Sequence, residues 1–427
     1  MEKLLIRSVR ILDPTSGFDG IGDILTEGGK IARVGQNLSC PPNACEISGS
    51  GLVAAPGLVD MHVHLRDPGQ TEKEDILSGG RAAAAGGVTS LLCMPNTWPA
   101  ADSPEVIRYI KEKAEHAAAR VYPAAAVSKG LRGREPCDWR ALKEAGAVAL
   151  SDDGRPVESS AVMAAAMMAA SELSLTVCAH CEDLSLSMGG KMNEGAVSAE
   201  LGVKGVPAAA EDCGTAREIA LAAAYDVPVH ICHVSTKNSV AMIRDAKRRG
   251  VSVTAETGPH YFSLTELELL SRDADYRMSP PLRTEEDRIA VIEGLSDGTI
   301  DAIATDHAPH TPQEKSDFLA APNGTVGMET SLAAGITYLV KPGFLTLAEL
   351  VRLMTCSPAQ ILHLHAGTLH PGAPADLALF QPDEEWLVDP TLLHGKSRNA
   401  AFKGRTLTGR VHLTVCGGRV VFRAASD

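Results

Sequence analysis

The chain has 427 residues, of which 44% are hydrophobic and only 4% aromatic, and its formal net charge is −13. This length allows one large domain with a smaller one beside it, and the hydrophobic share is enough for a sizeable core. The acidic balance argues against nucleic acid as a partner, because phosphate binding needs a basic surface. Abundant Gly and Ala with few aromatic residues favour a closely packed α/β enzyme over an aromatic binding module.

The cysteines and the N-terminal segment bear on the compartment. Ten Cys residues show no disulfide framework, and the C-x-x-C of Cys178 and Cys181 lacks the second pair of a zinc ribbon. We interpret them as small buried hydrophobic residues of a reducing compartment. The start MEKLLIRSVRILDP carries charges where a signal peptide is apolar, and no run approaches the roughly 18 apolar residues of a membrane span. We therefore expect a cytoplasmic protein without a membrane partner.

Both ends of the chain are predicted to be rich in strands. Residues 1–56 contain LLIRSVRILD, GDILTEGGKIARVGQ and SGLVAAPG, and residues 366–427 contain ADLALFQPD and TLTGRVHLTVCGGRVVFRA. We expect the two ends to pair into one small composite β-sandwich domain. Residues 57–365 would then form a catalytic barrel inserted between them.

Strand patterns alternate with helix patterns in this middle part. Eight strands each precede a predicted helix, at residues 72–86, 104–119, 138–145, 158–172, 211–225, 238–249, 265–271 and 330–340. Eight strand–helix units predict a TIM-type (β/α)8 barrel. A doubly wound open sheet is the structural alternative, but it would not bring the first and the eighth strand together.

Side chains that can bind metal end five of these strands, in GLVDMHVHL, AVALSDDG, LTVCAHCED, VPVHICHVS and IDAIATDHAPH. They are His62, His64, Asp152 or Asp153, His180, His233 and Asp306. A barrel of parallel strands brings all strand C-termini to one face, so these residues can share one metal centre. His62 and His64 are two residues apart and point to the same side of a strand, whereas His230 differs from His233 by an odd number and is interpreted as structural.

The fourth and eighth strands supply carboxylates. Asp152 and Asp153 are both candidates; we favour Asp153, which shares the parity of Ser151, and leave Asp152 to hydrogen-bond the turn at Gly154. Asp306 could bind a metal and also accept a proton. Four His and two Asp exceed the four ligands of one tetrahedral site and favour a two-metal centre with a bridging hydroxide. These ligands select Zn²⁺ first, with manganese, cobalt or iron as alternatives.

Further motifs extend the pattern over essentially the whole chain. DMHVHLRDPG, CMPN, SDDG, CAHCED, HVST and ATDHAPH, followed by SPPLR, GTVGMET, SPAQIL, GAPADLALF and GRTLTGRV, resemble the bacterial dihydroorotases of the amidohydrolase superfamily. The resemblance implies a (β/α)8 barrel with a small composite β domain and a metal centre at the barrel mouth. It also implies the reversible interconversion of L-dihydroorotate and N-carbamoyl-L-aspartate in de novo pyrimidine (UMP) biosynthesis.

The resemblance carries metal ligation to His62, His64, His180, His233 and Asp306. Many relatives bridge the metals with a carbamylated Lys on strand 4, which ALSDDG lacks, and Asp153 fits the Asp of the resembling subgroup. Zn²⁺, two ions per subunit, is the implied cofactor. Metal-bound hydroxide would attack the ring amide carbonyl, and Asp306, the catalytic residue, would carry the proton to the ring nitrogen.

The resemblance also implies a substrate-binding set, namely Arg66, Asn96, Ser279, His310 and Gly327. A guanidinium at the barrel mouth can bind the carboxylate beside the ring bidentately, and the backbone of the 322–327 loop would line the pocket. Many relatives have Asn at the position of Ser279 and an aromatic residue at that of Asn323. His260, in GPHYF, departs from the commoner TPHH pattern and receives no role.

Two other functions stay open. Hydantoinases and allantoinases share the barrel and most ligands, but they usually keep the strand-4 Lys and lack the Arg of L-R-D-P-G. A non-catalytic transcarbamoylase scaffold would tend to lose metal-binding His residues, and none is lost here. We expect a small-molecule substrate, a homo-oligomer and, as an open option, a complex with aspartate transcarbamoylase.

Overall fold

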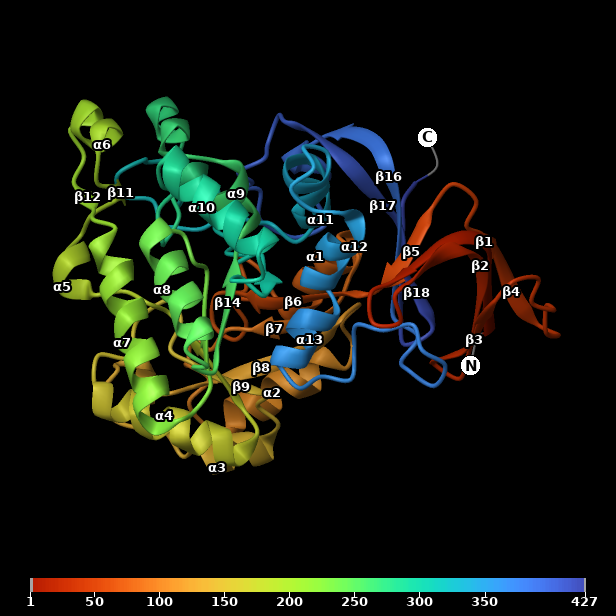
Figure 1. The fold of residues 1–427 in the computed structure, drawn as a ribbon, viewed down its shortest axis with the longest axis horizontal. Coiled ribbons are helices and arrows are strands. Elements are labelled where there is room, and N and C mark those ends of the chain that lie inside the picture. Colours follow the sequence, from red (N-terminus) through yellow and green to blue (C-terminus); the bar gives the residue numbers. More distant parts are fainter. Residues whose placement is uncertain (1–2, 426–427) are drawn as a thin grey trace.

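The barrel consists of eight parallel strands, and the computed structural model describes it within residues 3–425 (Figure 1). The strands are β6 Leu58–Val63, β7 Val88–Cys93, β8 Arg120–Ala126, β9 Ala149–Ser151, β10 Thr176–Ala179, β13 Val229–Ile231, β14 Val253–Thr257 and β15 Ala302–Ile303. A parallel bridge between Val63 and His307 joins the first strand to the segment after the last, and His64 N–H donates to His307 O at 2.8 Å. The predicted closed barrel is therefore confirmed over the open sheet.

Helices cover the outside of the barrel. The main ones are α1 Ile76–Ala85, α2 Pro104–Ala114, α3 Trp139–Ala145, α4 Ser160–Leu173, α7 Ala209–Tyr225, α8 Lys237–Arg248, α10 Glu285–Ser296, and α11 Ser331–Gly335, which continues as the π-helix Ile336–Val340. Shorter elements fill the connections: η1 Lys129–Leu131, α5 Leu184–Ser187, β11 Met192–Asn193, α6 Ala196–Leu201, β12 Gly205–Val206, α9 Pro259–Ser263, η2 Glu266–Ser271, η3 Ala274–Tyr276, α12 Leu347–Leu353, α13 Cys356–Ile361 and η5 Pro390–Leu392. Within residues 3–425, no helix is both long and apolar enough to cross a membrane.

The helix that follows the seventh strand differs from the prediction. Residues 265–271 were expected to be this helix, but they form only the 3₁₀ turn η2, and α10 packs beside α8 instead. Thr284 starts α10 with a capping box to Asp287. Three acidic residues occupy the first turn of α10, where their charge interacts favourably with the positive end of the helix dipole. This start signal is present in RTEED, so α10 could have been found from the sequence.

Strands from both ends of the chain build the smaller domain. Its single hydrogen-bonded sheet runs β18-β17-β16-β5-β1-β2-β3, with β4 paired to β1. The strands are β1 Lys3–Asp13, β2 Phe18–Glu27, β3 Lys30–Gly35, β4 Ala44–Ser48, β5 Val53–Pro56, β16 Leu377–Leu387, β17 Thr406–Cys416 and β18 Arg419–Arg423. Antiparallel pairing of β5 with β16 joins the two ends, whose N- and C-terminal strands lie side by side in Figure 1. The expected composite β domain is thus present as one continuous sheet, with buried Leu4, Ile6, Leu377 and Leu413 in its core.

Polar contacts hold this domain against the barrel. Arg120, at the start of β8, donates from Nε and Nη2 to the two carboxylate oxygens of Asp376, both at 3.1 Å.

Six of the ten cysteines are buried free thiols, as expected, whereas Cys40, Cys45 and Cys213 are exposed and Cys416 is half-buried.

Candidate metal centre and active site

The six donors predicted from the strand ends lie together at the barrel mouth. His62 belongs to β6 and His64 follows it, while Asp153, His180, His233 and Asp306 follow β9, β10, β13 and β15. Five of these side chains are at most 5% exposed, and that of Asp306 is 13% exposed. Parallel strands end at one face of the barrel, which is why residues so far apart in the chain meet there.

His62 and His64 form one half of the donor cluster. His64 Nε2 lies 2.9 Å from Asp306 Oδ1 and 3.4 Å from Asp153 Oδ2. His62 Nε2 lies 3.4 Å from Asp153 Oδ1 and 3.6 Å from Asp306 Oδ1. The H-x-H pair therefore presents the same ring nitrogen of both imidazoles to the same two carboxylates.

His180 and His233 form the other half. His180 Nδ1 and His233 Nε2 are 2.9 Å apart, and each lies 3.3 Å from Asp153 Oδ1. Two sets of donors consequently share one carboxylate: His62, His64 and Asp153, and Asp153, His180 and His233, each with donor atoms within 4.8 Å of one another.

The chemistry of these donors fits divalent cations. Imidazole nitrogen and carboxylate oxygen are ordinary ligands of zinc and related metals. The Nε2 atom of His62 is buried and has no hydrogen-bond partner in residues 3–425, which a bound ion would supply. Burial disfavours charge on Asp153, but His62, His180 and His233 outweigh it and hold the pKa of this carboxyl well below its usual range. A cation can take over this role from the imidazole protons.

Neighbouring side chains fix the other ring nitrogens of the H-x-H pair. His62 Nδ1 lies 2.6 Å from Glu256 Oε1, and His64 Nδ1 lies 2.8 Å from Asn96 Oδ1. Because the carboxylate and the amide oxygen only accept, both Nδ1 atoms donate, and both Nε2 atoms are the ring nitrogens that face the cluster and could bind an ion. This is the usual way in which proteins orient metal-binding imidazoles.

Three residues of the site have left-handed backbone conformations. The φ angles of Arg66, His233 and Asp306 are 60°, 38° and 46°. Such conformations are strained for residues other than Gly and persist where the surrounding structure enforces them, often at functional sites. Here they turn the chain sharply at strand ends that carry candidate ligands.

A cavity of about 260 Å³ opens onto the donors, and its size suits a ligand of about one ring. It is lined by His64, Arg66, Asn96, Asp153, Gly154, His180, Ser279, Asp306, Ala308, His310, Asn323 and Gly324. The predicted substrate residues Arg66, Asn96, Ser279 and His310 are among them. Gly327 is not: its N–H donates to His307 Nδ1 at 3.2 Å, and Asn323 and Gly324 represent the 322–327 loop instead.

Arg66 is a buried cation without an acidic partner. Arg66 as a whole residue is 8% exposed, and its Nε donates to Pro309 O at 3.3 Å. Within residues 3–425, no carboxylate oxygen lies within the 4.0 Å of a salt bridge with this guanidinium. Burial lowers the pKa of Arg66 to about 10, so the group stays charged at neutral pH. Beside it, burial and Arg66 lower the pKa of His310 to about 3, which keeps that imidazole neutral.

Other candidates lie outside the donor cluster. The Asp152 carboxylate accepts from Val127 N at 2.8 Å and Ser128 N at 3.0 Å and so holds the turn after β8, while the Asp152 backbone carbonyl accepts from Arg155 N at 3.0 Å across the turn at Gly154. His230 faces Thr254 and Glu256 inside the barrel, as a structural residue would. His260 is buried, and burial lowers its pKa to about 4.

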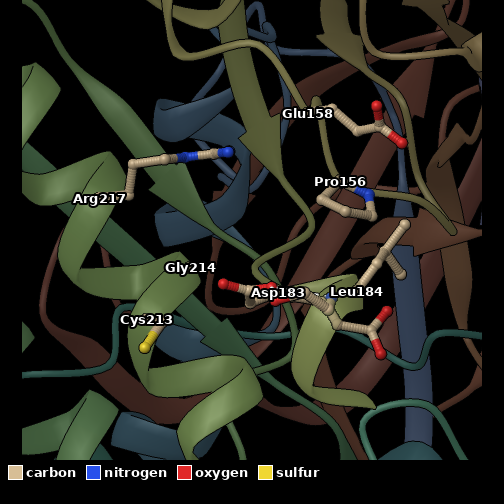
Figure 2. Close-up of a pocket in the computed structure, with 9 residues that line it drawn as sticks. Pro156, Glu158, Asp183, Leu184, Cys213, Gly214 and Arg217 are labelled. Carbon is tan, nitrogen blue, oxygen red and sulfur yellow. Dashed lines mark hydrogen bonds between the residues drawn. The ribbon is translucent and has the colours of Figure 1, made fainter. Parts of the chain in front are cut away.

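A second cavity of about 320 Å³ lies beside the site (Figure 2). Arg217 and Cys213 of α7 border it on one side, with Pro156 and Glu158 on the other. Glu182 also lines it, and Glu182 Oε2 lies 3.3 Å from His180 Nε2. Glu182, the partner of His180, therefore borders an accessible cavity, whereas Glu256, the partner of His62, is buried.

Sequence reasoning missed three acidic residues around the centre, namely Glu182, Glu256 and Asp60. Asp60 accepts from Thr305 N at 3.0 Å and Thr305 Oγ1 at 2.6 Å, which ties β6 to the segment after β15. Burial raises the pKa of Asp60 to about 6. The signal available for Asp60 and Glu256 was an acidic residue inside a predicted barrel strand, in GLVDMHVHL and in VTAETG.

Comparisons with known proteins agree with this geometry. A family model described as Dihydro-orotase-like matches residues 51–239. A dihydroorotase from Geobacter metallireducens is 50% identical over 422 residues, covering 98% of this chain and 99% of that protein. A dihydroorotase from Acetivibrio thermocellus is 48% identical over 422 residues, with the same coverage of 98% and 99%.

Solved structures with the same fold include cyclic amide hydrolases. The L-hydantoinase (dihydropyrimidinase) of Arthrobacter aurescens has a TM-score of 0.89 at 25% identity, covering 98% of this chain and 96% of that one. A D-hydantoinase (dihydropyrimidinase) from Thermus sp. has a TM-score of 0.83 at 27% identity, covering 98% and 95%. Since full-length relatives at about half identity are dihydroorotases, the chain belongs to the dihydroorotase family of the amidohydrolase superfamily.

Proposed function

We propose that this enzyme opens and closes the ring amide of L-dihydroorotate, interconverting it with N-carbamoyl-L-aspartate in de novo pyrimidine biosynthesis. The observation that carries the proposal is the unpaired guanidinium of Arg66 in the same small cavity as the donor cluster. A buried charge without a partner is costly, so the site is built for an anionic ligand. Dihydroorotate has a carboxylate beside the ring amide that must react.

The proposed cofactor is a pair of Zn²⁺ ions, one held by His62, His64, Asp153 and Asp306 and the other by Asp153, His180 and His233. The shared position of Asp153 between the two donor sets supports this count. When bound, such ions lower the pKa of a coordinated water toward about 7 and polarise a carbonyl group.

Asp306 is the proposed proton carrier. It lines the cavity, and hydrogen bonding from His64 with the charge of His62 outweighs burial and lowers the pKa of its carboxyl. The carboxylate is therefore ionised at neutral pH and can accept the proton of the attacking water at an oxygen facing the cavity. It then returns the proton to the departing ring nitrogen.

The remaining cavity residues would orient the ring. Arg66 would bind the substrate carboxylate through its terminal nitrogens, and Asn96, whose oxygen accepts from His64, would present its amide nitrogen to the ring. Ser279, the neutral His310 and the backbone of the loop that contains Gly327 complete the proposed substrate-binding set. Barrel geometry would hold the ring against the donors, as productive orientation requires.

Arg66→Ala tests the proposal with two substrates that differ in one group. Dihydrouracil is dihydroorotate without the carboxylate, so it cannot gain from the guanidinium. We expect Arg66→Ala to raise KM for dihydroorotate roughly tenfold to more than a hundredfold. A hydrogen bond to a charged group is lost, and its loss weakens substrate binding by about 1.5–3 kcal/mol. Metal content should not change. If wild type and Arg66→Ala had the same kinetics toward dihydroorotate, the result would favour a hydantoinase or allantoinase. The same holds if wild type turned over hydantoin or allantoin in preference to dihydroorotate.

The assembly and the domain division are also proposals. We propose a cytoplasmic homo-oligomer, with residues 1–56 and 366–427 as the β domain and 57–365 as the barrel. A complex with aspartate transcarbamoylase is a further proposal. Light scattering of the purified protein, alone and mixed with that enzyme, measures both associations.

A further inference from the structure

Glu256 lies beneath the donor cluster, inside the barrel, and is not part of the cavity lining. Glu256 is 1% exposed, and its Oε1 atom lies 2.6 Å from His62 Nδ1. The other oxygen, Oε2, lies 3.3 Å from Nε2 of the fully buried His230. His230 is in turn held by Thr254, whose Oγ1 is 2.9 Å from His230 Nδ1.

A carboxylate in this place needs a reason. Burying an ionised acid costs several kcal/mol unless it is paired and hydrogen-bonded. The side chains that face it are two imidazoles, and the thiol of Cys232 is also near. A hydrophobic residue would fill the barrel interior at lower cost, as Ala and Met side chains do around it. The position of the carboxylate therefore points to a role exerted through His62.

The hydrogen bond determines which ring nitrogen of His62 is free. With Nδ1 donating to Glu256, Nε2 is the nitrogen that can give its lone pair to an ion, and it lies 3.4 Å from Asp153 Oδ1. Had Nε2 carried the proton, it would have pointed an N–H at the space where an ion is proposed. A charged acceptor also makes the imidazole a stronger ligand than a neutral one would.

We infer that Glu256 is a positioning residue for the metal centre: it locks the tautomer of His62 and thereby sets the affinity of the ion held by His62, His64 and Asp153. The ion held by Asp153, His180 and His233 does not depend on it, because none of those three side chains forms a hydrogen bond or ion pair with Glu256. This inference rests on the proposed metal centre, and it assigns different partners to its two ions.

Stepwise titration of the metal-free, full-length protein with Co²⁺ tests this inference. Wild type should bind two ions, and Glu256→Gln, which keeps an acceptor oxygen but removes the charge, should weaken one step by about 10–100-fold. The other step should stay within about twofold. The matched control is Glu218→Gln, since Glu218 on α7 is also a fully buried carboxylate but pairs with Arg217 and not with an imidazole.

The outcomes separate the two levels of the argument. If both steps of Glu256→Gln match wild type, or both weaken equally, the inference is overturned and Glu256 is only a structural residue. If wild type itself binds no ion, the proposed metal centre fails first. Melting temperatures of the metal-free variants, together with the control, show whether a change in affinity merely follows from loss of folding.

Discussion

His62 and His64 leave one strand together, whereas His180 and His233 come from two different strands and contact both each other and Asp153. In the first half, Glu256 inside the barrel and Asn96 at its mouth accept hydrogen bonds from the Nδ1 atoms of His62 and His64. In the second half, Glu182 borders an accessible cavity, and His233 Nδ1 has no hydrogen-bond partner in residues 3–425. Two halves with the same kinds of donor thus differ in how firmly the protein orients them.

The largest effect is expected where the halves join. Asp153→Ala removes the carboxylate that both donor sets share, so both ions and all turnover should be lost. Breaking a buried charged pair costs about 3–5 kcal/mol, or two to almost four orders of magnitude in affinity. Metal analysis after dialysis measures this loss. Asp152→Ala, one residue away and bound to the Val127–Ser128 turn, is the control that should keep its ions.

Asp306→Asn should separate ion binding from proton transfer. The amide keeps an oxygen near His64 but cannot accept the proton of the attacking water. We expect kcat to fall by about 10²–10⁴-fold, the usual contribution of a general base, with both ions still bound at high Co²⁺ concentration. Normal turnover with full metal content would exclude Asp306 as the proton carrier.

Chelation should distinguish the halves by rate. Glu182, which lies 3.3 Å from His180, lines the cavity of Figure 2, so a chelator should remove the ion of the His180 and His233 half first. We expect two phases of ion release, with activity lost in the faster phase. The absorption of bound Co²⁺ measures this release. A single phase would show that both halves lose their ions at the same rate.

The smallest effect is expected for Glu182→Gln. Glu182 is 20% exposed and lies 3.3 Å from His180. The hydrogen bond that Glu182 accepts from His180 is therefore weaker than the one that Glu256 accepts from His62. We expect the affinity of the His180 and His233 site to fall less than tenfold, in the Co²⁺ step that Glu256→Gln leaves intact. If Glu182→Gln and Glu256→Gln weakened the same Co²⁺-binding step, Glu182 and Glu256 would not act on different ions, and the assignment would be wrong.

The sequence was informative where a rule of the fold acts on neighbouring residues. Strands that end in His or Asp predicted the donor cluster, because every parallel strand of a barrel ends at the same face. The link between Glu256 and His62 joins residues on β14 and β6, and spacing along the chain does not measure a distance across a barrel. Gly327 illustrates the same limit, since loop motifs do not show which backbone atoms face the cavity.

The pairing of β5 with β16 sets an order of events during synthesis. Ala54 pairs with Leu379, so the ribosome must make the entire barrel before the small sheet can be completed. Barrel strands pair with predecessors that have already emerged, and can therefore assemble as they are made. Until β16 arrives, β5 exposes an unpaired strand edge, the kind of surface that promotes aggregation of nascent chains. Rapid completion of the barrel shortens that exposure.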